Sequence, residues 1–115
     1  MRLKSSGTRR EFLSEARESI RESLAGGYPV IGQTAQGLGL STRTLQRRLH
    51  EAGVSYGKLV EKVRLDEARN LLQNNDLKVA AIASRLGYTD PSSFTRFFLR
   101  CTGTSPRAFR REHQR

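Results

Sequence analysis

The sequence predicts an all-α protein, and three observations support this fold class. The strong hydrophobic periodicities are all helical, with apolar residues recurring at intervals of three and four positions. Only 3 prolines and 10 glycines interrupt the 115 residues. A helix, a glycine turn and a capped helix occur twice. At this length the chain can bury one compact core or two small lobes, which excludes a large enzyme with a deep cleft.

Three helices are expected in the first half of the chain. In the stretch REFLSEARESIRESLAGG, apolar residues recur at every fourth position, and a glycine pair ends the helix. A second helix, over residues 31–38, has apolar residues on one face, although Gly32 and Gly37 each cost about 1 kcal/mol relative to alanine in a helix interior. Ser41 then caps a third helix, which continues to about residue 52.

Residues 55–74 favour one long helix whose apolar stripe changes face. At about 100° per residue, the apolar residues of its first half cluster together, and those of its second half centre roughly 130° further round. The two groups are Tyr56, Leu59, Val60 and Val63, and Leu65, Ala68, Leu71 and Leu72. We therefore expect one helix to serve two cores.

Three shorter helices complete the chain. The first covers residues 79–86. Asp90 followed by Pro91 is a strong helix start, because the carboxylate caps the first turn and proline fits its first position. Ser105 followed by Pro106 repeats this start for the last helix.

The two halves of the chain align as an internal repeat. The matched pairs, at offsets of 48 to 50 residues, include Ile31 with Val79, Ala35 with Ala83, Gly39 with Gly87, Ser41 with Asp90, Leu45 with Phe94, Arg47 with Arg96, and Gly53 with Gly103. A short helix, a glycine turn and a second helix form the helix-turn-helix arrangement, whose second helix can enter the major groove of DNA. Many helical proteins contain such pairs, so the pattern alone does not identify a DNA-binding protein. The charge of the chain and the residues on the exposed face of each second helix have to support that interpretation.

The charge of the chain indicates an acidic partner. The net charge is +10, and a surplus of this size is costly in self-repulsion unless a polyanion neutralises it. Arginines gather in both copies of the repeat, at residues 43–48 and at residues 96–115, where six arginines face only Glu112. Nucleic acid is therefore the leading partner.

Helical spacing directs a polar face of each capped helix outward. In the first copy this face holds Arg43, Gln46, Arg47 and His50, and in the second copy it holds Ser92, Ser93, Thr95 and Arg96. Arginine pairs bidentately with guanine, and glutamine with adenine. A single arginine is about as often a solvated charge as a ligand, but Arg47 and Arg96 occupy the same place in both copies.

Two stretches, LGLSTRTLQRRLHEAGVSYGKLVEKVRLDEARNLL and IASRLGYTDPSSFTRFFLRCTGTSPRAFRR, resemble the DNA-binding domain of the AraC/XylS family of bacterial transcription regulators. The second carries the Gly-aromatic turn, the central phenylalanine and the Gly-x-Ser-Pro before the last helix. The resemblance covers residues 9–112. It implies seven helices in two helix-turn-helix lobes, 9–54 and 75–115, joined by the linking helix 55–74. Both recognition helices, 41–52 and 91–101, would lie in successive major grooves, whose separation of about 34 Å is close to the linking helix's length.

The resemblance also implies roles for individual residues. It places Arg43, Gln46 and Arg47 of the first lobe, and Ser92, Ser93 and Arg96 of the second, at base edges. It places a DNA phosphate at Thr104 and Ser105, before the last helix, and we expect Arg48 and Arg100 to contact phosphates too. Thr42, His50 and Thr95 are further candidates for DNA contact. Because serine discriminates bases less than arginine or glutamine, we expect the first lobe to carry more of the specificity.

Other function classes fit the residues less well. An enzyme is not expected, because His50 and His113 lie far apart, and we expect no metal or cofactor, since Cys101 alone cannot supply a zinc cluster and is typical of a small buried residue. A non-specific RNA or single-strand binding module remains the alternative. Such modules expose stacking aromatic rings, whereas most aromatic residues here lie at core spacing or at turns.

The location and partners follow from these expectations. No apolar run reaches the roughly 18 residues of a membrane span, and the N-terminus lacks the apolar core of a signal peptide, so we expect a cytoplasmic protein without membrane contact. Residues 1–8 are typical of a disordered lead-in or linker. The partner is double-stranded DNA, and the resemblance adds RNA polymerase. The family usually joins this domain to an effector-binding or dimerising domain, which we expect to be missing here.

Overall fold

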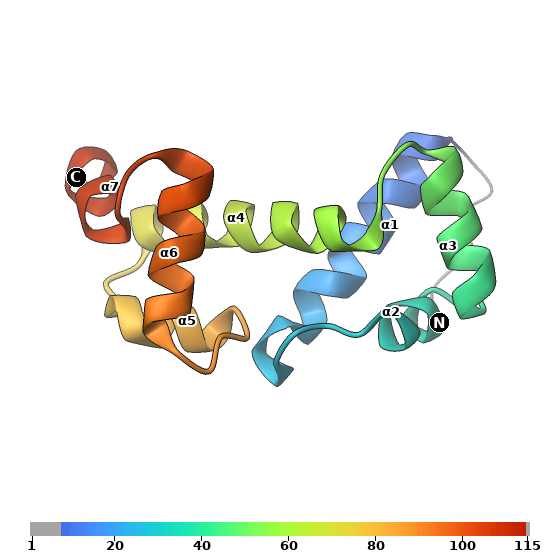
Figure 1. Ribbon diagram of the computed structural model, residues 1–115, viewed down its shortest axis with the longest axis horizontal. Helices are drawn as coiled ribbons and strands as arrows, with labels where there is room; N and C mark the ends of the chain where they lie inside the picture. The colour runs from blue at the N-terminus through green and yellow to red at the C-terminus, as the bar shows by residue number, and fades with distance from the viewer. Residues whose placement is uncertain (1–7, 115) are drawn as a thin grey trace. The chain divides into compact units, whose positions relative to one another are not determined.

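The computed structural model describes residues 8–114, and this part of the chain contains seven α-helices and one short 3-10 helix (Figure 1). These elements are α1 (Arg9–Ser23), η1 (Leu24–Gly26), α2 (Ile31–Gly37), α3 (Thr42–Glu51), α4 (Tyr56–Asn74), α5 (Val79–Arg85), α6 (Pro91–Thr102) and α7 (Pro106–His113). The all-α expectation is confirmed. Over the described range, none of these helices has the length and apolar character that crossing a membrane requires.

The described chain divides into two compact units. The first comprises Pro29–Val63 together with the described residues up to Ser23, and the second comprises Leu24–Tyr28 together with the residues from Arg64 onward. Buried side chains of α4 are Leu59, Val60 and Val63 in its first half, and Ala68, Leu71 and Leu72 in its second half. The α4 helix therefore contributes to two cores, as its two-faced apolar stripe predicts.

Side-chain caps begin the helices where the sequence predicts them. The side chains of Ser41, Asp90 and Ser105 accept hydrogen bonds from the backbone N–H groups of Thr44, Ser92 and Ala108, each at 3.1 Å. Each cap satisfies a donor that the first turn of a helix would otherwise leave unpaired. The local signals for α3, α6 and α7 are thus confirmed.

An additional cap begins α1. The Thr8 hydroxyl accepts from the Glu11 N–H at 3.1 Å, and the Glu11 carboxylate accepts from the Thr8 N–H at 3.0 Å, which forms a reciprocal capping box. Thr8 therefore starts the first helix rather than ending the expected lead-in, of which residues 1–7 lie outside the described residues. The pattern Thr-x-x-Glu was the sequence signal for this cap.

The first unit packs α1 against both helices of its helix-turn-helix pair. Its buried core includes Ala16 and Ile20 of α1 together with Leu45 and Leu49 of α3. In Figure 1, α3 runs across the end of α2 instead of alongside it. The apolar residues of α3 thus face α1 and α2, and its polar residues remain outside.

Close contacts in the middle of α2 and at its C-terminal end hold this helix in the first unit. The Thr34 hydroxyl lies 2.7 Å from the Tyr56 hydroxyl, which donates to the Pro29 carbonyl at 2.9 Å. A Cβ atom on Gly37 would lie 2.8 Å from the Ser19 hydroxyl oxygen, so glycine permits the close approach of α1 and α2. The helix with two glycines therefore forms because tertiary contacts outweigh its weak propensity.

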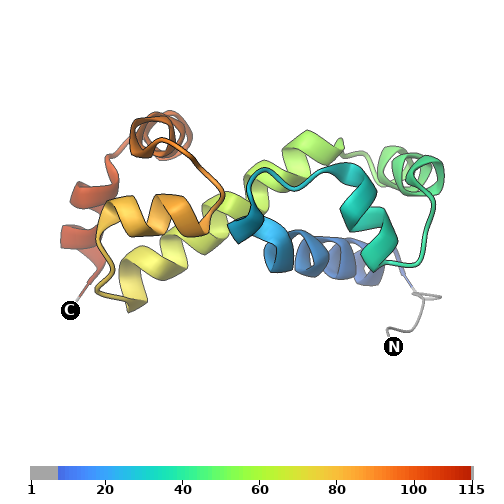
Figure 2. The same cartoon turned by 90° about the horizontal axis from the view of Figure 1, so that it is seen from below.

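The second unit has an aromatic core. The Phe94 and Phe98 ring centroids are 5.9 Å apart, and those of Phe98 and Phe109 are 5.4 Å apart with an edge-to-face geometry. Tyr88 packs 5.6 Å from Phe94, and Phe97 is also buried. Figure 2 shows α6 nearly end-on and α5 from the side, so the two helices of this pair cross.

Candidate nucleic-acid interface

The first candidate reading surface is the outer face of α3. Leu45 and Leu49 are buried, whereas Thr42, Arg43, Gln46, Arg47 and His50 are exposed, as helical spacing predicts. Arg47 Nε lies 3.8 Å from the Glu51 carboxylate, and both side chains are more than half exposed, so this pair is weak and leaves the guanidinium accessible. The face thus presents two arginines, a glutamine and a histidine together.

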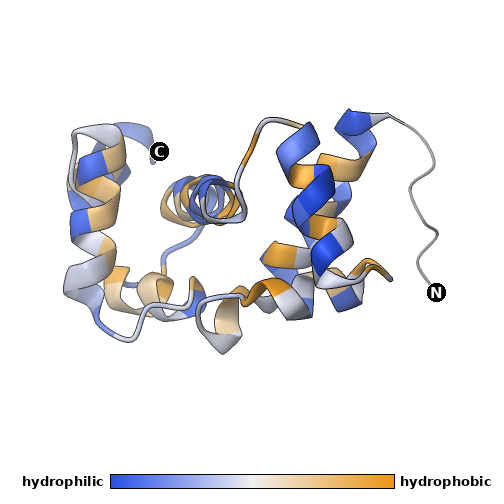
Figure 3. Ribbon diagram, turned by 45° about the vertical axis from the view of Figure 1, so that its right-hand side comes forward, coloured by the Kyte–Doolittle hydropathy of each residue, from blue (hydrophilic) through white to orange (hydrophobic). Residues whose placement is uncertain are grey.

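The second candidate reading surface is the outer face of α6. Phe94 and Phe98 point inward, Ser92 and Arg96 are exposed, and Ser93 and Thr95 are half-buried. Arg96 Nη2 donates to the Ser93 hydroxyl at 3.3 Å, so these two predicted residues lie together. Figure 3 shows that α3 is the more hydrophilic of the two second helices.

The turns of the two pairs have the same hydrogen-bond pattern. In the first pair, the Leu40 N–H donates to the Ala35 carbonyl at 2.9 Å, and the Gly39 backbone has a positive φ of 73°. In the second pair, the Tyr88 N–H donates to the Ala83 carbonyl at 3.0 Å, and the φ of Gly87 is 91°. Glycine adopts this left-handed conformation without the penalty that a side chain brings. The sequence repeat is therefore a structural repeat.

The two helix-turn-helix pairs of the structure agree with a comparison of the sequence with known protein families. A helix-turn-helix domain family matches residues 34–112, which include both α3 and α6. The chain belongs to the AraC-type helix-turn-helix family. The match covers more than half of the chain and confirms the family resemblance stated from the sequence.

Individual relatives also match most of this chain. The transcriptional regulator VqsM of Pseudomonas aeruginosa is 38% identical over 93 residues, which are 81% of this chain and 29% of VqsM. The crystal structure of CdpR from Pseudomonas aeruginosa is 37% identical with a TM-score of 0.69, covering 92% of this chain and 32% of CdpR. The DNA-binding domain of AdpA, solved in complex with a target DNA, is 28% identical with a TM-score of 0.70, covering 87% of this chain and 90% of that chain.

Two arginines expected at DNA phosphates contact aromatic rings in this AraC-type chain. The guanidinium of Arg48 lies 5.5 Å from the Phe12 ring centroid and is half-buried, whereas the rest of the reading face of α3 is exposed. The guanidinium of Arg100 lies 5.6 Å from the Phe97 ring centroid, and its side chain is exposed. Of the two, Arg100 is therefore the more accessible to a phosphate.

The predicted phosphate site at the start of α7 already has internal partners. The Thr104 N–H donates to the Thr102 hydroxyl at 3.2 Å, and the Ser105 hydroxyl accepts from the Ala108 N–H. Pro106 has no N–H to donate. A phosphate at this helix start would have to compete with the Thr102 hydroxyl for the Thr104 N–H.

Two arginines with a different role were not singled out by the sequence reasoning. Arg64 is buried, and Arg110 is half-buried with its guanidinium donating to the Leu72 carbonyl at 3.2 Å and the Asn75 carbonyl at 2.9 Å. Arg110 thereby caps the C-terminus of α4. The signal for Arg64 was its helical phase, since it precedes Ala68 by four residues and so lies on the buried face of α4.

The expectation that Cys101 is buried is wrong. Its side chain is exposed on α6. The apolar stripe of α6 runs through Phe94, Phe97 and Phe98, which are three and four residues apart. Cys101 continues this spacing, three residues after Phe98, yet its side chain is in solvent, so helical spacing alone does not decide its burial.

Proposed function

We propose that the chain binds double-stranded DNA sequence-specifically as the DNA-binding part of a bacterial transcription regulator. In this proposal α3 and α6 each lie in a major groove, and the site consists of two half-elements about one helical turn of DNA apart. The observation that carries the proposal is the repeated pair with matching turns, each followed by a helix with an exposed arginine at the same position. The known DNA complex of the AdpA domain supports it.

The proposal assigns base contacts to the outer faces of both helices. These residues are Arg43, Gln46 and Arg47 on α3, and Ser92, Ser93 and Arg96 on α6. The first set has two arginines and a glutamine, which select guanine and adenine, whereas serine bonds to several bases. Arg96 also donates to the Ser93 hydroxyl in the free protein. We therefore propose that α3 carries more of the sequence preference.

The test is an in vitro selection from duplex pools, followed by fluorescence anisotropy on the selected sites. Selection should converge on two short elements about ten base pairs apart. Arg47→Ala should lower the preference at one element by about tenfold or more, because a bidentate base contact contributes about 1–3 kcal/mol. Arg96→Ala should cause a smaller loss, at the other element.

The control is Arg69→Ala, which removes one exposed charge from α4 next to Asp66. It should leave the preference at both elements unchanged. A larger loss from Arg96→Ala than from Arg47→Ala would reverse the ranking of the two helices. Binding that ignores sequence, or that favours single strands, would show that charge alone explains the affinity and would overturn the proposal.

The burial of the aromatic rings argues against the single-strand alternative. Phe12, Phe94, Phe97, Phe98 and Phe109 are all buried. Among the described aromatic residues, only Tyr28 is exposed, at 52% of the residue surface. A strand-binding surface needs several exposed rings on which successive bases stack.

We also propose that the whole regulator contains an effector-binding or dimerising domain and contacts RNA polymerase. The chain spans 29% of the length of VqsM and 32% of CdpR, which leaves room in such proteins for a further domain. Size-exclusion chromatography of the full-length protein and of this chain, each with and without RNA polymerase, tests both parts of the proposal.

A further inference from the structure

A buried guanidinium lies behind the turn of the second helix-turn-helix pair. Arg64 of α4 is 8% exposed. Its Nε donates to the Leu86 carbonyl at 3.0 Å, and its Nη2 makes a longer contact with the Gly87 carbonyl at 3.5 Å. These carbonyls lie at the end of α5, where the helix leaves backbone oxygens unpaired and carries a partial negative charge.

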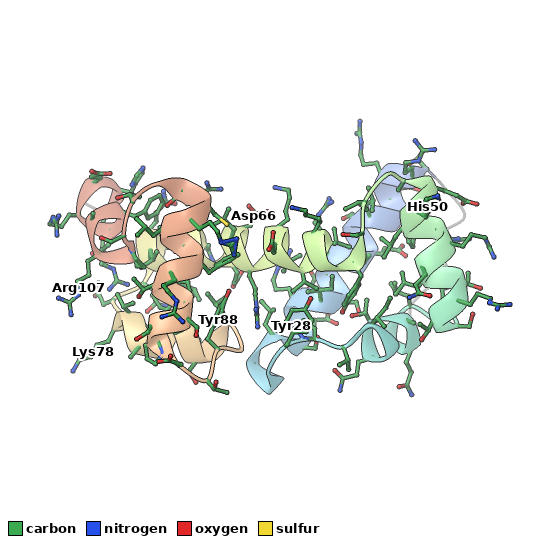
Figure 4. All side chains as sticks on the ribbon, in the orientation of Figure 1. Tyr28, His50, Asp66, Lys78, Tyr88 and Arg107 are labelled. Carbon is green, nitrogen blue, oxygen red and sulfur yellow. The ribbon has the colours of Figure 1, made fainter. Side chains whose placement is uncertain are left out.

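Two tyrosine rings cover the same guanidinium. The guanidinium carbon of Arg64 lies 4.2 Å from the Tyr88 ring centroid and 5.0 Å from that of Tyr28. In Figure 4, Tyr28 and Tyr88 both lie below α4. A planar guanidinium can stack on rings and donate along its edge at the same time, which an ammonium group cannot do.

The turn is also packed against the segment Leu24–Tyr28. A Cβ atom on Gly87 would lie 2.6 Å from the Leu24 carbonyl oxygen and 2.7 Å from that of Gly27. Backbone atoms therefore touch the turn on one side, while Arg64 bonds to its carbonyl groups. The path of the chain into α6 is determined by residues distant in the sequence.

We propose that Arg64 is a positioning residue for DNA recognition by α6. The inference rests on the proposed function, since it assigns base contacts to α6. Asp90, the cap of α6, follows Gly87 by three residues, and the predicted base contacts Ser92 and Arg96 lie in the first two turns after it. A displacement of the turn therefore moves these side chains relative to the groove, and recognition requires placement to within about 0.5 Å.

The test compares two substitutions that each remove an internal arginine from the second unit. Arg64→Met removes the guanidinium beside the turn, and Arg110→Met removes the one that caps α4. Methionine keeps much of the volume and leaves no unpaired charge. We expect Arg64→Met to lower sequence preference at the α6 element about three- to tenfold, a part of the effect of one base contact, with the α3 element unchanged. Arg110→Met should leave both preferences unchanged at a temperature where the variants are equally folded.

A double-substitution cycle tests whether Arg64 affects sequence preference through the position of α6. If Arg64 acts through α6, Arg64→Met should cost little further preference once Arg96 is replaced by alanine, because coupled residues are not additive. Arg64→Lys keeps the charge but cannot stack and donate together, so we expect it to restore stability more than sequence preference. It also serves as the test variant should Arg64→Met fail to fold.

The titration of Tyr88 reports the contact without DNA. Burial raises the pKa of the Tyr88 phenol, and Arg64 beside it opposes that rise. Arg64→Met should therefore shift the Tyr88 pKa further upward, and Arg110→Met should not. Because the chain has no tryptophan, tyrosinate absorbance measures this shift, with Tyr88→Phe identifying the component.

The outcomes separate this inference from the proposed function. Equal losses at both elements, or the same loss from Arg110→Met, would show that Arg64 only stabilises the unit and would overturn the inference. Full additivity with Arg96→Ala would do the same. If the unsubstituted chain selects no duplex sequence, the proposed function fails first, and the Tyr88 titration still shows whether Arg64 covers the ring in solution.

Discussion

Two arginines of this chain bond to its own backbone carbonyls instead of extending into solvent. Arg64 bonds at the end of α5, and Arg110 bonds at the end of α4. Both are counted in the net charge of +10, yet neither belongs to the exposed faces of α3 and α6. The net charge of a sequence therefore indicates attraction to a polyanion only when the structure shows which arginines are exposed and which bond inside the protein.

Gly87 and Gly103 offer a matched test of why glycine occupies the second turn. Both have positive φ, at 91° and 79°, but a Cβ atom on Gly103 would meet nothing within 4 Å. We expect Gly103→Ala to lower the free energy of unfolding by about 1–2 kcal/mol, the cost of the left-handed conformation. Gly87→Ala should cost about 1–3 kcal/mol more, because its Cβ would overlap the carbonyls of Leu24 and Gly27. Urea unfolding measures both, and equal costs would contradict the close contact.

The exposure of a candidate base-contacting residue was predictable from the sequence only where its position in the helical period determines which way it faces. Arg43, Gln46 and Arg47 are exposed because they alternate with the buried leucines of α3, a pattern that needs no tertiary information. The direction of Arg48 toward the ring of Phe12 depends on how α1 packs against α3. Their roles at DNA, and those assigned to Thr104 and Ser105, stay predictions.

At the scale of elements, α2 shows how packing sustains a weak helix. A Cβ atom on Gly32 would lie 3.9 Å from the Thr42 hydroxyl, an ordinary contact, whereas one on Gly37 would collide with the Ser19 hydroxyl. We expect Gly32→Ala to raise the free energy of unfolding by about 0.5–1 kcal/mol through helix propensity. Gly37→Ala should lower it.

The Ser19→Ala background provides the control for α2. It removes the hydroxyl that the new methyl group would meet, so Gly37→Ala should become neutral or stabilising there. Thermal unfolding followed by circular dichroism measures the stability of Gly32→Ala, Gly37→Ala, Ser19→Ala and the Ser19→Ala/Gly37→Ala double variant. A Gly37→Ala substitution that stabilises the unsubstituted chain would show that α1 and α2 are not in close contact at this point.

The helices themselves were the most predictable elements. Ser41, Asp90 and Ser105 cap their helices because a side-chain oxygen reaches backbone donors two or three residues away. The same local rule extends α1 back to Thr8 through Glu11, which the compositional argument for a lead-in overlooked. Such signals are readable because both partners lie in the same short stretch.

At the scale of the whole molecule, the net charge predicts strongly salt-dependent binding to DNA. Each phosphate that a basic side chain neutralises releases counterions, so the logarithm of affinity falls with the logarithm of salt by about 0.9 per contact. We expect Arg100→Met, which removes an exposed arginine, to reduce this slope by about 1. Arg110→Met should leave the slope unchanged, although both remove one charge. Anisotropy titrations at several salt concentrations measure it, and equal changes would contradict the division into internal and external arginines.

Local patterns in the sequence predict the seven helices, most of their side-chain caps, the internal repeat and the polar faces of α3 and α6. Each of these depends on residues within a few positions of one another, through hydrogen bonds in one turn or the period of a helix. Three other features follow from tertiary packing: Arg64 bonds to the turn after α5, Leu24–Tyr28 packs with the second unit, and Cys101 is exposed. These outcomes depend on which distant segments fill the same volume, and no local pattern encodes that.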